Sequence, residues 1–214
     1  MALEITKGDD LIGLVKVLSL GGKMCAYKGH GRRYGGHGRY ESAASVVPGV
    51  PANVAMDPLY RLLESQLGMD TAMETYEAVS NYGDKPVPEE GKRKLAERIN
   101  DGGDRYLVVL GMGSIVDTAI YLDGKIPEDK TIVFTGSRIE AERIVPRDSA
   151  VINHDRVVRV PDSDAPMQLG YALGVAQLAK PGIYVALDGR TLSLADVASG
   201  RIDRQGYTIT KMVG

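Results

Sequence analysis

The chain has 214 residues, of which 43% are hydrophobic and 25% are charged, and these proportions are typical of one substantial globular domain. A formal net charge of −2 gives no overall electrostatic reason to expect nucleic acid or an anionic membrane as a partner. No basic segment followed by a long apolar run opens the sequence, so we expect a cytoplasmic protein without a membrane span. Cys25 is the single cysteine and no zinc-ligand spacing occurs, so we expect neither a metal nor another cofactor.

Short β-branched runs beside glycines alternate with longer segments of helical period. This alternation is typical of βαβ units around a buried parallel sheet. Buried parallel strands are nearly continuous apolar runs. The strands predicted on this basis cover residues 14–20, 75–80, 105–110, 131–135 and 182–187.

The helices are predicted between these strands. The first begins at Asp57 and Pro58, because aspartate can cap free N–H groups and proline suits the first turn, and it ends at Gly68. The second begins near Pro88, followed by acidic residues that favour the positive end of a helix. Two further helices are predicted over about 114–122 and 164–179, and Asp164 is expected to cap the latter.

Two segments do not fit this alternation. The glycine-rich, basic stretch CAYKGHGRRYGGHGRYESAASVVPGVP, at about 25–52, is too long for an ordinary connection, so we predict a mobile loop. The charged stretch 137–162 is predicted to be an insertion that contains a β-hairpin, with strands at 150–152 and 157–160. We treat residues 1–214 as a single domain that contains both segments.

The residues that directly follow the first four predicted strands are small, polar or charged. In an open parallel sheet, ligands bind beyond the carboxyl ends of the strands, and glycines there let a ligand approach the backbone closely. Free N–H groups near the start of the third helix could also receive a carboxylate or phosphate. A plainer interpretation is that these glycines only turn the chain. The predicted ligand-binding residues are Gly22, Lys23, Asn81, Asp84, Gly111, Met112, Gly113, Ser114, Ser137 and Arg138.

Several of these strand ends resemble motifs of the L-asparaginase family. VLSLGGKM resembles the strand and TGGTI motif that open these enzymes, and VVLGMGSIVDTA resembles their HGTDT motif with its helix. TIVFTGSR resembles the V-x-TG-A-x-R strand end, and DAPMQLGYALGVAQLAKPGIYVALDGR resembles the DGPxNL helix, the next strand and a D/N-G-R turn. The motifs follow the family order over nearly the whole chain. The resemblance implies a three-layer, Rossmann-like α/β domain with a mostly parallel sheet, like the asparaginase N-terminal domain, without the smaller C-terminal domain.

The same resemblance shows where this sequence departs from the family. Asparaginase chemistry uses a threonine nucleophile that a second threonine, an aspartate and a lysine activate. The first threonine falls on Lys23, the second threonine and the aspartate fall on Met112 and Gly113, and the lysine falls near Ser199. Methionine and glycine offer neither a nucleophile nor a base. Lys23 could act as a base or form a Schiff base only where burial favours its neutral amine.

The candidate catalytic residues are therefore Lys23, Ser114, Thr135 and, from the mobile loop, Tyr34, which could take the place of the family's loop tyrosine. Our main hypothesis is an asparaginase-like domain with degenerate catalytic residues that binds a small polar or anionic, amino-acid-like ligand or a partner protein. The alternative is an active amidohydrolase with a rearranged nucleophile, acting on asparagine, glutamine or a related amide. A third hypothesis, ranked last, is nucleotide or nucleic-acid binding through the basic stretch 28–39. The sequence leaves a homo-oligomer open.

Overall fold

The computed structural model describes residues 15–21, 23–24, 27–29, 58–80, 82, 85–139, 141–145 and 156–199. Within these ranges a six-stranded sheet has the order β3-β1-β4-β5-β8-β9, in which only β9 is antiparallel to its neighbour. The predicted mostly parallel sheet is confirmed. Each of the five predicted strands is present, whereas β9, which follows the D-G-R turn, was not predicted. The strands are β1 Val15–Ser19, β3 Tyr76–Ala78, β4 Arg105–Val109, β5 Thr131–Thr135, β8 Gly182–Leu187 and β9 Arg190–Ser193.

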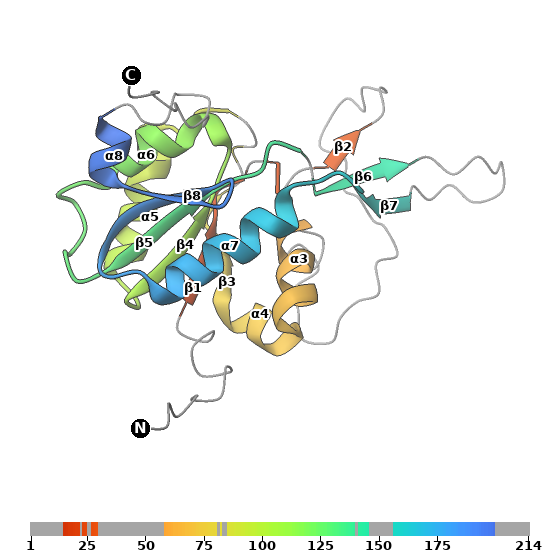
Figure 1. The fold of residues 1–214 in the computed structure, drawn as a ribbon, viewed down its shortest axis with the longest axis horizontal. Coiled ribbons are helices and arrows are strands. Elements are labelled where there is room, and N and C mark those ends of the chain that lie inside the picture. Colours follow the sequence, from red (N-terminus) through yellow and green to blue (C-terminus); the bar gives the residue numbers. More distant parts are fainter. Residues whose placement is uncertain are drawn as a thin grey trace, which may run out of the picture.

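Helices cover both faces of this sheet, which gives the three layers of the α/β fold (Figure 1). One face carries α3 Pro58–Leu67, α4 Met69–Thr75 and α7 Ala165–Leu178. The other face carries α5 Glu89–Asn100, α6 Ile115–Leu122 and α8 Leu194–Ala198. None of the described helices is long and apolar enough to cross a lipid bilayer.

The two cores follow from the alternation of side chains along each strand. On β4, Leu107 and Val109 pack into the core on the α7 side, whereas Tyr106 and Val108 pack into the core on the α5 side. All four side chains are at most 2% exposed. A strand that is buried on both faces has no polar alternation, and this is why the sequence pattern predicted the central strands so directly.

The predicted helix boundaries largely hold. Helix α3 ends before Gly68, but the chain then continues as α4, which the sequence did not predict. Gly68 has a φ of 83°, a left-handed conformation that suits glycine and redirects the chain between the two helices. Helix α5 begins directly after Pro88, and its inward residues Leu95 and Ile99 are fully buried as expected.

A second, small sheet corrects two of the sequence predictions. It contains β2 Tyr27–Gly29, β6 Glu142–Val145 and β7 Arg156–Arg159, in the order β2-β6-β7. The predicted hairpin exists, but its first strand is β6 and not 150–152, which lies outside the described residues. The start of the predicted loop 25–52 is also a strand, because β2 pairs in parallel with β6. The rest of that loop lies outside the described residues.

Candidate functional site

The carboxyl ends of β1 and β5 bring two predicted site residues together. Lys23 lies in the turn after β1, and its half-buried ammonium donates a hydrogen bond from Nζ to the carbonyl oxygen of Arg138 at 2.7 Å. The Ala141 amide donates to the Lys23 carbonyl at 3.2 Å and fixes the same turn from its backbone side. Gly22, Asn81, Asp84 and Tyr34 lie outside the described residues.

The carboxyl end of β4 leads into a 3-10 turn over Met112–Ser114, preceded by Gly111. Gly113 is exposed, whereas the predicted catalytic candidate Ser114 is only 3% exposed. The Ser114 hydroxyl accepts a hydrogen bond from the Val87 amide at 3.1 Å and donates to the Lys85 carbonyl at 3.3 Å. Ser114 therefore fastens the segment that precedes α5 to the end of β4.

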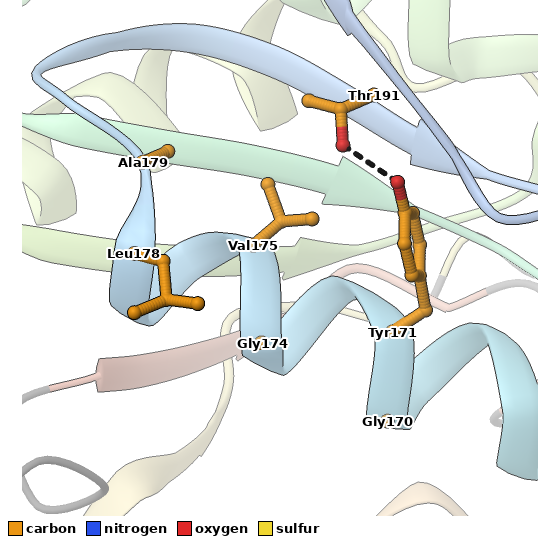
Figure 2. Close-up of a pocket in the computed structure, with 7 residues that line it drawn as sticks. All are labelled: Gly170, Tyr171, Gly174, Val175, Leu178, Ala179 and Thr191. Atoms are coloured by element: carbon orange, nitrogen blue, oxygen red, sulfur yellow. Dashed lines mark hydrogen bonds between the residues drawn. The ribbon is translucent and has the colours of Figure 1, made fainter.

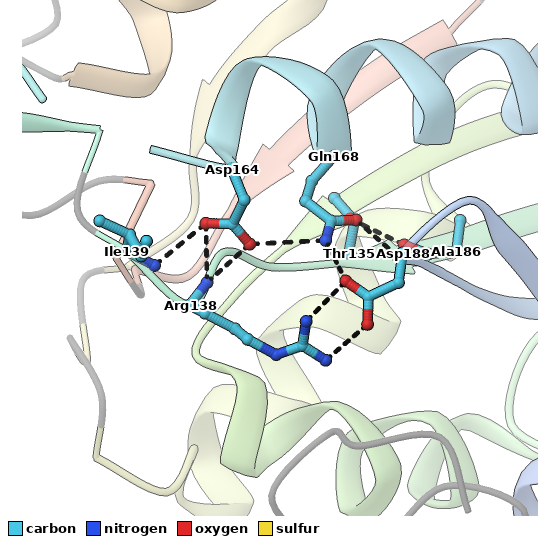
Figure 3. A network of polar contacts seen from close by, with 7 residues as sticks. All are labelled: Thr135, Arg138, Ile139, Asp164, Gln168, Ala186 and Asp188. Atoms are coloured by element: carbon cyan, nitrogen blue, oxygen red, sulfur yellow. Dashed lines mark hydrogen bonds and ion pairs between the residues drawn. The ribbon is translucent and has the colours of Figure 1, made fainter. Parts of the chain in front are cut away.

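Thr135, the candidate at the end of β5, also has a structural partner. Its side chain is fully buried, and its hydroxyl donates to the Ala186 carbonyl on β8 at 2.9 Å (Figure 3). This bond extends the pairing of β5 with β8 beyond the last residues in register. Within the described residues, neither Ser114 nor Thr135 contacts a side chain that could remove its proton.

Asp164 is the centre of a polar network at the end of β5. Its carboxylate accepts a hydrogen bond from the Ser137 hydroxyl at 2.6 Å. It also accepts from the amides of Arg138 and Ile139, at 3.1 and 3.0 Å (Figure 3). The prediction that Asp164 caps α7 is wrong for its side chain, which makes no capping hydrogen bond. The hydroxyl of Ser163 instead accepts from the first amide of the helix.

Two opposing effects set the charge state of Asp164. Partial burial raises the pKa of its carboxyl, but hydrogen bonds from Ser137, from the amides of Arg138 and Ile139 and from Gln168 lower it, and the net result is a pKa below the ordinary value of 3.8. The carboxylate is therefore ionised at neutral pH. A carboxyl group with a lowered pKa is also a weak general base.

Arg138 and Gln168 join this network to the turn between β8 and β9. The guanidinium of Arg138 pairs with both carboxylate oxygens of Asp188, at 2.7 and 2.5 Å. The fully buried Gln168 donates to the Asp188 carboxylate at 2.8 Å and accepts from the Asp188 amide at 3.0 Å. Asp188 and Gly189 both have positive φ, 52° and 70°, as a tight type I′ hairpin turn requires.

Sequence reasoning included Ser137 and Arg138 in the ligand-binding set but missed Asp164, Gln168 and Asp188 as site residues. Their signal was present in the TGSR, DAPMQL and DGR motifs, which the fold brings into one network. The glycine of TGSR has a packing reason as well. A Cβ at Gly136 would lie 2.7 Å from the Leu110 carbonyl oxygen, so the ends of β4 and β5 can approach each other only with glycine there.

A separate groove of about 550 Å³ lies between α7 and β9. Figure 2 shows the Tyr171 side chain extending from α7 to Thr191 on β9, where the two hydroxyls are 2.9 Å apart. The remaining lining is glycine or apolar, and no predicted site residue belongs to it. The described residues also contain no group of three or more His, Cys, Asp or Glu side chains that could hold a metal ion.

Comparison with known proteins supports the architecture rather than an activity. No family model and no curated protein matches the sequence. Among solved structures, a probable cytoplasmic L-asparaginase from Campylobacter jejuni matches over 85% of this chain, with a TM-score of 0.54 and 18% sequence identity. The chain has an asparaginase-like fold. It spans 48% of the length of that asparaginase, so the asparaginase-like region corresponds to about half of its structural neighbour.

Proposed function

We propose that this asparaginase-like chain binds a small polar or anionic, amino-acid-like ligand at the carboxyl ends of β1, β4 and β5 and has lost amide hydrolysis. The observation that carries the proposal is the replacement of reactive groups at these strand ends. Lys23, Met112 and Gly113 stand where the resemblance places the reacting threonines and the aspartate of asparaginases.

The nearby hydroxyls do not supply a new nucleophile. Attack on an amide carbonyl requires a hydroxyl within hydrogen-bond reach of a base. Ser114 and Thr135 donate to carbonyl oxygens, which cannot take up a proton. Ser137 does contact a carboxylate, but the lowered pKa of Asp164 makes that carboxylate a poor base.

The same geometry favours binding of an anionic group. An ammonium has three N–H donors, and the Arg138 carbonyl occupies one of those on Lys23. The other two have no acceptor within the described residues and can serve a ligand carboxylate. The exposed Gly113 leaves the backbone at the end of β4 open to close approach. The Arg138 side chain is held by Asp188, so its part is to position the carbonyl that orients Lys23.

Isothermal titration calorimetry with aspartate, asparagine, glutamate, glutamine and succinate tests the binding proposal. We expect saturable binding of at least one carboxylate-bearing compound and at least tenfold weaker binding by Lys23→Ala. The matched control is Lys180→Ala, which removes an exposed lysine elsewhere and is expected to bind normally. Absence of binding at millimolar concentrations, or normal binding by Lys23→Ala, contradicts the proposal.

A separate assay tests whether the chain has lost amide hydrolysis. Ammonia release from asparagine and glutamine, measured at high protein concentration, is expected to equal the release in protein-free buffer. Turnover that disappears in Ser114→Ala, Thr135→Val or Ser137→Ala would instead support an amidohydrolase with a rearranged nucleophile.

A further inference from the structure

The outward side of α7 lacks the polar character of a solvated helix surface. The helix sequence APMQLGYALGVAQL contains no charged residue. A helix that is apolar on all sides is normally buried on all sides. The exposed residues of α7 are nonetheless all apolar or glycine, namely Pro166, Met167, Gly170 and Leu178. Water therefore contacts a side of α7 whose composition is typical of a buried surface.

Helix α5, on the other face of the sheet, shows the contrast. Apart from Asn100, every exposed residue of α5 is charged. On α7, Met167 is 51% exposed and Leu178 is 83% exposed. The third exposed large hydrophobic residue of the described part of the chain is Ile120 on α6, at 46%. Exposed apolar side chains that gather on one element are typical of an interaction surface.

These exposed residues form one stripe along α7. Residues three and four positions apart lie on the same side of a helix. One side of α7, which includes Leu169 and Ala176, packs into the core. In Figure 1, α7 crosses in front of the six-stranded sheet, and no labelled element lies over it. We call the residues that follow this spacing on the outward side the α7 stripe: Met167, Gly170, Tyr171, Gly174 and Leu178.

We propose that the α7 stripe is the contact surface between two copies of this chain. In a two-fold contact of antiparallel helices, residues at equal distances on either side of the axis face each other. An axis at the middle of α7, between residues 172 and 173, makes Met167 face the partner's Leu178. The same axis makes Tyr171 face the partner's Gly174. Each large side chain of these pairs then meets a glycine or another large apolar side chain.

The charges beyond the two ends of α7 favour this arrangement. Asp162 precedes the helix, Lys180 follows it, and both are exposed. In the antiparallel pair, Lys180 lies at the same end as the partner's Asp162, and the symmetry repeats this match at the other end. A parallel pair would instead bring like charges together. Charge complementarity of this kind fixes the relative orientation of two partners.

The surroundings of the stripe also suit a contact with a second copy. The exposed residues Ser65 and Gln66 of α3 and Thr191 of β9 are polar but uncharged, as in the rim of an interface. Gln66 is joined to α7 by a hydrogen bond from Nε2 to the Pro166 carbonyl at 3.1 Å. A helix of 14 residues is about 21 Å long, so the contact is smaller than the about 800 Å² per partner of stable interfaces. We therefore expect a weak, concentration-dependent dimer.

Sedimentation velocity of the full chain over a range of concentrations tests the proposal. We expect a monomer–dimer equilibrium with a dissociation constant in the micromolar range. Leu178→Arg buries a charge in the apolar contact and is expected to raise the dissociation constant about tenfold or more. The matched control is Ile120→Arg, the same change at an exposed apolar residue outside the stripe, which is expected to stay within about twofold of the parent.

Mixing two variants tests the register of the helices. Met167→Glu alone is also expected to weaken the dimer, but a mixture of Met167→Glu and Leu178→Arg is expected to restore it. In the mixed dimer, the introduced glutamate faces the introduced arginine at one end, and the unchanged Met167 and Leu178 meet at the other. Restoration also shows that both variants are folded. A mixture of Leu178→Arg and Leu178→Glu is expected to stay monomeric, because these positions lie at opposite ends of the pair.

Four outcomes overturn the proposal. A chain that stays monomeric at every concentration would show that the stripe belongs to another occupant. Full dimerisation of Leu178→Arg, with an unchanged circular dichroism spectrum, would place the dimer contact elsewhere. Equal weakening by Ile120→Arg would show a general effect of added charge. Restoration by the two Leu178 variants would show a different pairing of the helices.

Discussion

At the carboxyl edge of the sheet, the ends of β5 and β8 resemble asparaginases more closely in sequence than the ends of β1 and β4 do. At the ends of β5 and β8, the TGSR, DAPMQL and DGR segments resemble the family and form a dense polar network around Asp164. At the ends of β1 and β4 stand Lys23, Met112 and Gly113, at the positions that the motif resemblance assigns to the reacting residues of asparaginases. The motif resemblance is therefore stronger where the side chains form hydrogen bonds that hold this edge of the sheet together than at the ends of β1 and β4.

The largest expected effect tests the network end. Asp164→Ala leaves the Ser137 hydroxyl and the amides of Arg138 and Ile139 without their shared acceptor. The Ile139 amide keeps the Ser137 hydroxyl as an acceptor, and that hydroxyl keeps the Ile139 carbonyl, so the loss falls mainly on the Arg138 amide. An unsatisfied donor costs about 1–3 kcal/mol, so we expect the free energy of unfolding to fall by about 2–3 kcal/mol. Urea unfolding measures this change. The exposed Asp162→Ala is the control, and a loss below about 1 kcal/mol for Asp164→Ala contradicts a structural role for the network.

The pH dependence of stability gives a second test of the same carboxylate. Because its pKa is lower in the folded chain than the ordinary value of 3.8, the stabilisation is complete above that value and is lost as pH falls through the lower folded pKa. Unfolding free energies from pH 7 down to pH 2 should therefore decline less steeply below pH 4 in Asp164→Asn than in the parent chain. Identical slopes would show that Asp164 is not the responsible group.

The buried hydroxyls are predicted to contribute to stability and not to catalysis. Thr135→Val leaves the Ala186 carbonyl without this donor, and Ser114→Ala leaves the Val87 amide without its acceptor. Each change is expected to lower the free energy of unfolding by about 1–2 kcal/mol. Ligand affinity in calorimetry should stay within twofold of the parent. A variant with unchanged stability and lost ligand affinity would show that the hydroxyl binds the ligand and does not stabilise the fold.

The ion pair between Arg138 and Asp188 is expected to have a smaller effect. Its geometry is bidentate, but the two side chains keep 33% and 31% of their surface exposed, so solvent screens the attraction. A double-mutant cycle with Arg138→Ala and Asp188→Ala should give a coupling free energy of about 1 kcal/mol. Raising the salt concentration should reduce this coupling, and a coupling of zero would exclude the pair from the network.

Lys23 is expected to show the smallest effect on folding. Lys23→Ala removes one hydrogen bond from a half-buried ammonium and should change the free energy of unfolding by less than about 1 kcal/mol. Under the proposed function, the same variant loses ligand binding. Large destabilisation by Lys23→Ala, measured by urea unfolding, would show that Lys23 stabilises the fold. The ends of β1 and β4 would then not differ in this respect from the ends of β5 and β8.

The central strands could be predicted because their signal is local. A strand buried on both faces, such as β4 with Leu107 and Val108, is a continuous apolar run. Helix α4 was missed because Gly68 is a stop signal whether or not another helix follows it. The first strand of the hairpin was misplaced because short β-branched runs occur at both 144–145 and 150–152, and only pairing with β7 distinguishes them.

The candidate site was predictable only in part, for a similar reason. Parallel topology is enough to bring Lys23 and Arg138 to the same edge of the sheet, and the structure places them in contact. The role of Asp164 was not predictable, because a local rule assigns it to the start of α7. Its carboxylate instead accepts from the backbone amides of the turn after β5, of which the Ile139 amide also donates to the Ser137 hydroxyl.

The sequence by itself determined the buried strands, the main helices and the identity of the residues at the strand ends, because apolar periodicity and capping signals act over a few residues. Only the tertiary structure decided which polar groups meet: the joining of β2 to β6, the turn of Asp164 toward residues 137–139 and the pairing of Arg138 with Asp188. These contacts join segments far apart in the chain. Polar groups removed from water must find hydrogen-bond partners, and the fold determines which groups are near enough to pair. A short stretch of sequence does not contain that information.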